Sequence, residues 1–356
     1  MLRFHSMRVC EIRPDAEDSV AISLEAPREA RQEYHGLPGQ HVVLRAQTSG
    51  GEARRTYSLT SAPGEWPLRV CVRVHRNGGM SRHLAEGLRV GDTIDVLPPN
   101  GSLTPRFSDR RICVGFASGC GITPVLAVAR SVLASGSRFI LFYGNTSTGR
   151  TMCLEDVLAL KDRYLDRFAV HFFMSREPQE VEIYNGRLDT DRVRGVAQVL
   201  FDPREVSECF VCGPGTMIED VTAALRQCGI EPERIHSEYF TAGAPAGNMD
   251  REVQAGSAAR PEDVTEVTLV MDGRRRSFTM RRNAETVLDA AGRAGLELPF
   301  SCRAGVCSTC RTKVVRGAVE MAENHALEEW ELREGYVLAC QSRATTPALE
   351  LDYDEK

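Results

Sequence analysis

Short segments of alternating hydrophobic and polar residues run through residues 1–107. HVVLRAQ and LRVCVRV show the period of two that is typical of half-buried strands. Turns rich in Gly and Pro, such as LPGQ and LPPNG, separate these segments. The pattern predicts an antiparallel β-barrel over residues 1–107.

Continuous apolar segments replace the alternation from Arg111 onward. Four of them are each followed by a helical or loop segment: RICVGFA, RFILFYG, FAVHFFM and ECFVCG. Strands that are apolar on both faces are typical of a parallel sheet covered by helices. We therefore expect an α/β parallel-sheet domain over residues 108–240.

The composition changes again at residues 241–263, which are rich in Ala and Gly and carry no periodic apolar pattern. This segment predicts a flexible linker. After it, residues 264–356 begin with a hairpin-like pattern, EVTLVMDGRRRSFTM, and a helical pattern, TVLDAAGRAG. The chain is thus expected to be multidomain, as its 356 residues also suggest.

Charge and hydropathy exclude several classes of partner. The net charge is −5 and the chain has no Lys- or Arg-rich arm, so nothing favours nucleic acid. No apolar run approaches the roughly 18 residues of a membrane span, and the N-terminal segment lacks the apolar core of a signal peptide. We expect a cytoplasmic protein whose partners are small molecules or other proteins.

Four of the twelve cysteines have the spacing of a cluster site. Cys302, Cys307 and Cys310 lie within nine residues, and the next cysteine is Cys340, which gives C-x4-C-x2-C-x29-C. This is the spacing of plant-type ferredoxins, in which four thiolates hold a [2Fe–2S] cluster. Gly305 and its small neighbours let the loop backbone approach the sulfurs.

A zinc site and incidental buried thiols are the alternatives for these cysteines. Zinc sites usually show two C-x2-C pairs about 15–20 residues apart, whereas this segment has one such pair. A second C-x2-C pair, Cys209 and Cys212, lies in a predicted strand, where residues three apart point to opposite faces. We predict that Cys209 is a core residue and that Cys212 lies at a ligand-binding strand end.

Glycines follow the first strand of the predicted parallel sheet. FASGCGITP, residues 116–124, lies between the strand RICVG and a helical segment. Glycines at such a turn let backbone N–H groups and the helix N-terminus approach a pyrophosphate. Taken alone, the pattern is also compatible with a plain tight turn.

The order of the motifs resembles that of the ferredoxin-NADP reductase superfamily. The matching segments are Arg55-Thr56-Tyr57-Ser58, Gly78-Gly79-Met80-Ser81, Gly119-Cys120-Gly121-Ile122-Thr123-Pro124, Cys212-Gly213-Pro214 and Glu238-Tyr239-Phe240. With a plant-type ferredoxin appended as an α+β β-grasp domain, the chain resembles oxygenase electron-transfer components. Within that group it is most similar to the reductase subunits of phenylacetyl-CoA epoxidases, with ketosteroid hydroxylase reductases as near relatives. Cys120 departs from the family pattern, which usually has a smaller polar residue at this position.

For the barrel, the resemblance implies bound FAD. Arg55 would balance the pyrophosphate charge, Tyr57 would pack on the isoalloxazine ring, and the Ser58 hydroxyl would hydrogen-bond flavin N5. Ser81 would cap the short helix SRHLAEGL and bind the pyrophosphate. The other implied flavin residues are Leu59, Arg73, Val74, His75, Gly79 and Met80. Considered singly, these residues could also be core or surface residues.

For the parallel-sheet domain, the resemblance implies a nicotinamide nucleotide. Cys212 would lie near the nicotinamide, and Glu238 and Phe240 near the flavin ring. The nucleotide would also contact Gly119, Gly121, Thr123, Pro124, Gly213 and Pro214. Ser175 and Arg176 follow the strand FAVHFFM and could bind a 2′-phosphate, which favours NADPH over NADH. Glu177 weakens that preference, and Ser175 could simply cap a turn.

Electron counting gives the expected activity. A nicotinamide delivers two electrons as hydride and a [2Fe–2S] cluster accepts one at a time, so the flavin must stand between them. The expected catalytic residues are Ser58, Cys212 and Glu238, and the expected electron acceptor is an oxygenase component.

The eight histidines form no oxygen-activating motif. The alternatives are a reductase of another oxygenase, acting on ketosteroids or aromatic rings, and a non-enzymatic redox sensor.

Overall fold

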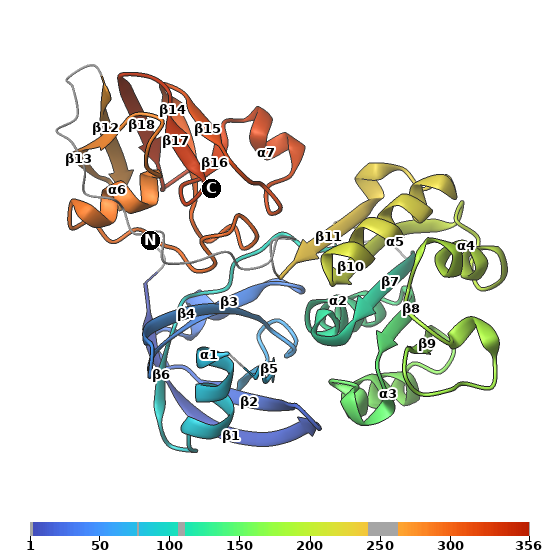
Figure 1. Cartoon of the computed structure of the whole chain (residues 1–356). Helices are drawn as coiled ribbons and strands as arrows, with labels where there is room; N and C mark the ends of the chain where they lie inside the picture. The colour runs from blue at the N-terminus through green and yellow to red at the C-terminus, as the bar shows by residue number, and fades with distance from the viewer. Residues whose placement is uncertain (1–2, 77, 106–110, 241–262, 356) are drawn as a thin grey trace. The chain divides into compact units, whose positions relative to one another are not determined.

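The computed structural model describes residues 3–76, 78–105, 111–240 and 263–355. It divides into two compact units, one over Phe4–Phe240 and the other over Thr241–Lys356 together with the N-terminal Met1–Arg3 (Figure 1). The predicted linker, residues 241–263, lies outside the described residues except for Asp263. Among the described helices, none combines the length and apolar character that a membrane span requires.

Six antiparallel strands form the first part of the larger unit, as the alternating pattern predicts. They are β1 (His5–Ala16), β2 (Ser19–Glu25), β3 (His41–Thr48), β4 (Gly51–Ser58), β5 (Leu68–Arg73) and β6 (Thr93–Val96), in the order β4-β3-β6-β1-β2-β5. An antiparallel bridge between Leu59 and Val70 joins the two outer strands, β4 and β5, and closes the barrel. Val42, Leu44 and Val72 point into its core.

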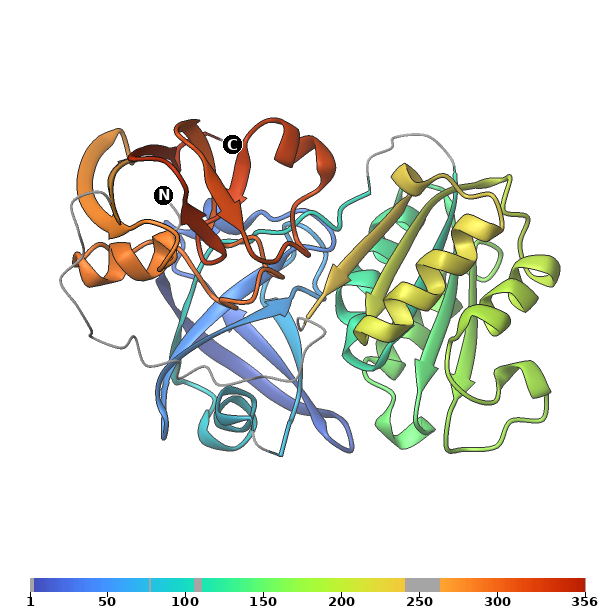
Figure 2. The ribbon, with the colours of Figure 1, turned by 45° about the horizontal axis from the view of Figure 1, so that its top comes forward.

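Five parallel strands form the second part, which confirms the α/β prediction. They are β7 (Ile112–Ser118), β8 (Arg138–Asn145), β9 (Phe168–Met174), β10 (Val206–Gly213) and β11 (Ile235–Tyr239), in the order β11-β10-β7-β8-β9. The covering helices are α2 (Ile122–Ala134), α3 (Leu154–Arg163), α4 (Thr190–Val199) and α5 (Gly215–Gln227). Figure 2 shows α5 lying along one face of this sheet.

Both faces of the parallel sheet are buried, which explains why its strands are apolar throughout. Cys113 and Leu141 pack into a core with α2 and α3. Val114 and Phe116 pack into a separate core with α4 and α5. The carboxyl ends of the strands remain as the edge where a ligand can bind.

Ion pairs join the barrel to the parallel-sheet domain. Asp156 on α3 lies 2.5 Å from Nη2 of Arg130 and 3.5 Å from Nη1 of Arg69 on β5. Arg13 on β1 lies 3.6 Å from the other oxygen of Asp156, whose side chain is 13% exposed. Because Asp156 is mostly buried, these pairs are screened less than fully exposed pairs. These ion pairs stabilise the packing of the barrel against the parallel-sheet domain.

The smaller unit has the β-grasp arrangement expected of a ferredoxin domain. Its main sheet has the order β13-β12-β18-β14-β16, with β12 and β18 parallel. The elements are β12 (Val264–Met271), β13 (Arg274–Arg281), α6 (Val287–Arg293), β14 (Arg311–Arg316), β15 (Val319–Met321), α7 (Glu329–Arg333), β16 (Tyr336–Leu338), β17 (Ser342–Ala344) and β18 (Ala348–Asp352). Thr286 caps α6 by accepting the Asp289 N–H at 3.2 Å. The predicted hairpin and helix are confirmed.

Candidate functional site

Four cysteine thiols converge in the loop between α6 and β14 and beside β16. The thiol of Cys302 contacts those of Cys307 and Cys340, and the thiol of Cys340 also contacts that of Cys310. The backbone N–H of Ala304 donates to the Cys302 sulfur at 3.3 Å. The structure therefore brings together all four cysteines that the spacing singled out.

The backbone of this loop requires glycine at one position. Gly305 has a φ of +74°, and a Cβ at this residue would lie 2.9 Å from the carbonyl oxygen of Glu323. Arg303 and Ser308 also adopt positive φ values, 54° and 50°. These conformations turn the chain around the sulfurs, so that N–H groups face them.

The separation of the sulfurs fits a two-iron cluster better than one zinc ion. Four thiolates on one zinc ion, with bonds of about 2.3 Å, lie within about 4 Å of one another. In the described part of the chain, no three of these four sulfurs lie mutually within 4.8 Å. Instead they form a chain of pairwise contacts, which would suit four ligands divided between two metal ions.

The other cysteine pair behaves as its strand position predicts. Cys209 and Cys212 are fully buried on β10, but Cys209 packs in the core beneath α4 and α5, whereas Cys212 packs in the core beneath α2. Their side chains therefore point to opposite faces of the sheet and cannot share a ligand. Cys212 lies next to the carboxyl end of β10, which ends at Gly213.

The end of β4 carries the residues expected to contact the flavin. Ser58 is buried, and its hydroxyl has no hydrogen-bond partner among the described residues. Tyr57 is half-buried against the barrel core, and burial raises the pKa of its phenol. Arg55 donates to the carbonyl of Arg54 at 2.8 Å. A bound flavin fits here, because it would give the Ser58 hydroxyl the partner that it lacks.

The segment after β5 corrects one prediction. Helix α1 (Gly79–Arg82) begins after Gly78, so Ser81 lies inside its first turn and does not cap it. The Ser81 hydroxyl instead accepts the His75 N–H at 3.1 Å and donates to the Gly78 carbonyl at 3.3 Å. Gly78, with φ −86° and ψ 96°, is the extended residue that precedes the helix, and Ser81 is the third helical residue. Contact of Ser81 with a pyrophosphate stays a prediction.

Arg73 has partners at the junction of the barrel and the parallel-sheet domain. Its Nη1 donates to Asp18 at 2.5 Å, and its Nη2 donates to the carbonyl of Arg150 at 2.9 Å. Val74 follows, and its N–H donates to the carbonyl of Asp18 at 2.8 Å. The structure thus accounts for Arg73 as a junction residue, and its contact with flavin stays a prediction.

Most of the residues predicted to bind the nucleotide lie at the carboxyl edge of the parallel sheet. Gly121 follows β7, and Thr123 donates to the carbonyl of Cys120 at 2.9 Å within this turn. Gly119 has a φ of +54°, and a Cβ there would meet nothing within 4 Å. The turn therefore presents backbone toward open space, as pyrophosphate binding requires. Gly213, Pro214, Ser175, Arg176 and Phe240 lie at the same edge, at or just after strand ends, and Pro124 lies in the first turn of α2.

Glu238 lies near the end of β11, where the parallel sheet meets the barrel. Its Oε1 lies 3.1 Å from Nδ1 of His41, the first residue of β3. The other carboxylate oxygen, Oε2, is buried without a partner in the described ranges. His41 belongs to no motif, so no local pattern singles it out. Its role depends on a contact between residues 197 positions apart.

Three domain families match this chain in succession. Residues 10–104 match the oxidoreductase FAD-binding domain, residues 116–223 the oxidoreductase NAD-binding domain, and residues 269–345 the 2Fe-2S iron-sulfur cluster binding domain. FAD, a nicotinamide nucleotide and a [2Fe–2S] cluster are therefore the cofactors of this protein.

Similar proteins cover the whole chain. A subunit of the 1,2-phenylacetyl-CoA epoxidase of Escherichia coli is 35% identical over 100% of this chain and 99% of its own. The ferredoxin reductase component of 3-ketosteroid-9-alpha-monooxygenase from Rhodococcus rhodochrous is 30% identical over 98% and 96%. The structure of phthalate dioxygenase reductase shares the fold, with a TM-score of 0.59, 23% identity and 98% coverage of both chains. The chain belongs to the FAD- and [2Fe–2S]-containing reductases of the ferredoxin-NADP reductase superfamily.

Proposed function

We propose that this enzyme transfers electrons from NADPH to an oxygenase of the phenylacetyl-CoA epoxidase type. When bound, FAD accepts hydride from the nucleotide, and the [2Fe–2S] cluster accepts electrons singly. The observation that carries the proposal is that Ser58 of the barrel and Glu238 of the sheet both neighbour His41, Ser58 as its partner in the β3–β4 ladder and Glu238 with Oε1 3.1 Å from its Nδ1. Each has one buried polar atom without a partner in the described structure.

Each half of the junction has a separate task in this proposal. Ser58 hydrogen-bonds the flavin at the barrel side, and Tyr57 packs against its ring. Cys212 and Glu238 are neighbours across the β10–β11 ladder and border the nicotinamide from the sheet side. Burial raises the pKa of the Cys212 thiol, and the nearby Glu238 charge raises it further. Cys212 therefore stays a neutral thiol that fills the site without adding charge.

The proposed domain division follows the same tasks. Residues 1–107 bind FAD, residues 108–240 bind the nucleotide, and residues 264–356 bind the cluster through Cys302, Cys307, Cys310 and Cys340. Residues 241–263 connect the nucleotide domain to the ferredoxin domain. A cytoplasmic location remains a prediction from the sequence.

The preference for NADPH rests on the loop after β9. Arg176 is exposed, and its side chain forms no ion pair with any described residue. The neighbouring Glu177 accepts hydrogen bonds from the Thr148 N–H at 2.7 Å and the Thr148 hydroxyl at 2.6 Å. These bonds lower the pKa of Glu177 and engage its carboxylate. The arginine is thereby left to pair with a 2′-phosphate.

An oxygenase that acts on ketosteroids is the second candidate partner, because relatives of that kind also align over almost the whole chain. Reconstitution with purified oxygenase components distinguishes the two. We expect NADPH-driven turnover with the epoxidase component and little with the ketosteroid component. The opposite ranking would replace the first partner by the second. Failure of NADPH and NADH to bleach the bound flavin would instead favour the redox sensor.

A further inference from the structure

His41 and Glu238 form a buried contact across the junction. The side chain of His41 is 4% exposed and that of Glu238 is 12% exposed, and Nδ1 and Oε1 are 3.1 Å apart. His41 begins β3 of the barrel, whereas Glu238 lies on β11 of the parallel sheet. A hydrogen bond to a carboxylate is stronger where water is excluded. This contact is therefore able to fix the position of the carboxylate.

The position of His41 is itself fixed by the barrel. Its backbone N–H donates to the carbonyl of Asn100 at 2.8 Å, and the Asn100 N–H donates back at 2.9 Å. Gly101 lies so close that a Cβ there would be 3.0 Å from Nδ1 of the imidazole. The ring consequently has little freedom to move away from Glu238.

His41 also lies beside the residue expected to contact flavin. In the antiparallel β3–β4 ladder, His41 and Ser58 are direct partners. Directly opposite residues of such a ladder project from the same face. On the other side, Glu238 is the direct partner of Cys212 in the β10–β11 ladder. His41 thus connects the flavin side of the junction to the nucleotide side.

We propose that His41 is a positioning residue for hydride transfer, an inference that rests on the function proposed above. It holds Oε1 of Glu238, which keeps the buried Oε2 available as an acceptor for the nicotinamide. Without His41, the carboxylate can rotate, and the nucleotide loses a fixed partner. The main consequence is a slower hydride step, with a smaller change in nucleotide binding.

Two substitutions at His41 test this role. His41→Leu removes the hydrogen bond, whereas His41→Asn keeps an N–H donor near the position of Nδ1. In anaerobic stopped-flow experiments, we expect His41→Leu to slow flavin reduction by NADPH about tenfold or more. The dissociation constant of NADP⁺, measured by calorimetry, should change by less than about threefold. His41→Asn should recover most of the rate, and both variants should retain bound FAD.

A double-mutant cycle distinguishes action through Glu238 from a general structural effect. If His41 acts by holding this carboxylate, His41→Leu should slow a Glu238→Gln variant by less than about twofold. A deuterium isotope effect with NADPH labelled at C4 should increase in His41→Leu, because hydride transfer becomes more rate-limiting. A loss of thermal stability alone would change neither the coupling between the two substitutions nor the isotope effect.

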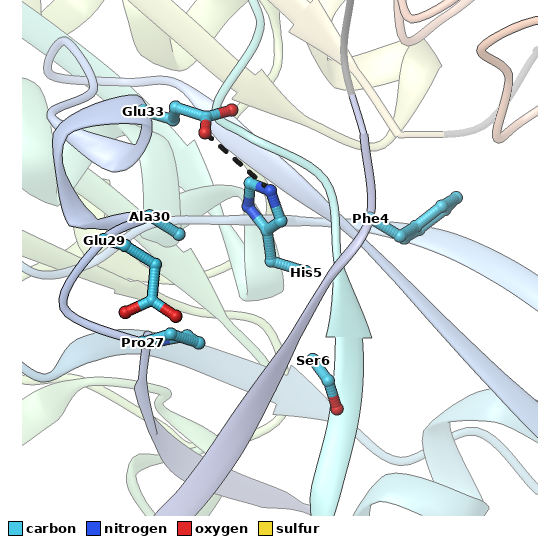
Figure 3. A pocket seen from close by; sticks show the side chains of 7 residues that line it. All are labelled: Phe4, His5, Ser6, Pro27, Glu29, Ala30 and Glu33. Atoms are coloured by element: carbon cyan, nitrogen blue, oxygen red, sulfur yellow. Dashed lines mark ion pairs between the residues drawn. The ribbon is translucent and has the colours of Figure 1, made fainter.

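A second His–Glu pair in the barrel supplies the control. His5 lies with Nε2 3.8 Å from Oε1 of Glu33, in a surface pocket that contains none of the residues assigned to the flavin or the nucleotide (Figure 3). We expect His5→Leu to leave flavin reduction unchanged. An unaltered rate in His41→Leu, or fully additive effects with Glu238→Gln, would overturn the positioning role. A wild-type flavin that neither NADPH nor NADH reduces would instead overturn the proposed function.

Discussion

The backbone of Gly121 lies against the carbonyl group of Cys212. A Cβ at residue 121 would be 2.1 Å from the carbonyl oxygen of Cys212 and 2.8 Å from the backbone nitrogen of Gly213. The glycine turn after β7 and the end of β10 are therefore packed backbone to backbone. This contact fixes the distance between the two segments that are expected to enclose the nucleotide.

Gly121→Ala should therefore destabilise the nucleotide domain. Because the clash involves backbone atoms, which cannot rotate away, we expect a loss of about 2–4 kcal/mol in the free energy of unfolding. The KM for NADPH should increase as well. Chemical denaturation and steady-state kinetics measure the two effects.

Gly215→Ala is the matched control in the same domain. A Cβ at Gly215 would meet only the ring of Tyr239, at 3.9 Å, which is ordinary contact. We expect its free energy of unfolding to stay within about 0.5 kcal/mol of the wild type. Equal stability of the two variants would contradict the backbone contact at Gly121.

Ser58→Ala should slow flavin reduction without lowering stability. The Ser58 hydroxyl is buried and has no partner among the described residues, so its removal takes no hydrogen bond from the protein itself. If the hydroxyl serves the flavin, the rate of reduction by NADPH should fall about tenfold or more. Stopped-flow absorbance and the thermal unfolding midpoint separate the two effects.

Ser58→Thr keeps a hydroxyl at the same position and should retain much of the rate. The assignment of Ser58 would fail if alanine and threonine variants reduced flavin at the wild-type rate. It would also fail if the alanine variant lost rate only together with a clear fall in its thermal unfolding midpoint.

Arg176→Ala should reduce the preference for NADPH over NADH. Loss of a charged hydrogen bond to the 2′-phosphate should lower the ratio of kcat/KM values by about 1.5–3 kcal/mol, or roughly 10- to 150-fold. Activity with NADH should change little. Steady-state rates with both nucleotides give the ratio directly.

The exposed Arg194 on α4 provides the control for charge alone. Arg194→Ala removes the same charge from the domain surface and should leave the preference unchanged. A wild-type preference for NADH, or equal effects of the two substitutions, would remove the support for Arg176.

The sequence predicted those parts of the structure that depend on local pattern. Alternation indicated the barrel strands, continuous apolar runs indicated the parallel sheet, and cysteine spacing indicated the thiol group. The opposite orientation of Cys209 and Cys212 also followed from strand geometry alone. In each case, the relevant residues lie within one element or follow a known spacing.

Contacts between distant elements could not be predicted in this way. The partnership of His41 with Glu238 depends on how the barrel packs against the sheet, and no local pattern encodes it. The same holds for Arg73, whose guanidinium pairs with Asp18 at the junction. Helix α1 begins at Gly79 although Ser81 is the better cap by side-chain chemistry, and the Ser81 hydroxyl hydrogen-bonds the His75 N–H and the Gly78 carbonyl instead.

The central claim is that electrons pass from the nucleotide through FAD to a cluster held by the four cysteines. Cys340→Ser tests it, with Cys228→Ser as a control at a partly exposed thiol beyond α5. The decisive measurement is electron paramagnetic resonance after anaerobic addition of NADPH, with flavin absorbance recorded on the same sample. We expect both variants to show flavin bleaching, but only the wild type and Cys228→Ser to show the signal of a reduced [2Fe–2S] cluster. A normal cluster signal in Cys340→Ser, or wild-type flavin bleaching without any cluster signal, would contradict the account.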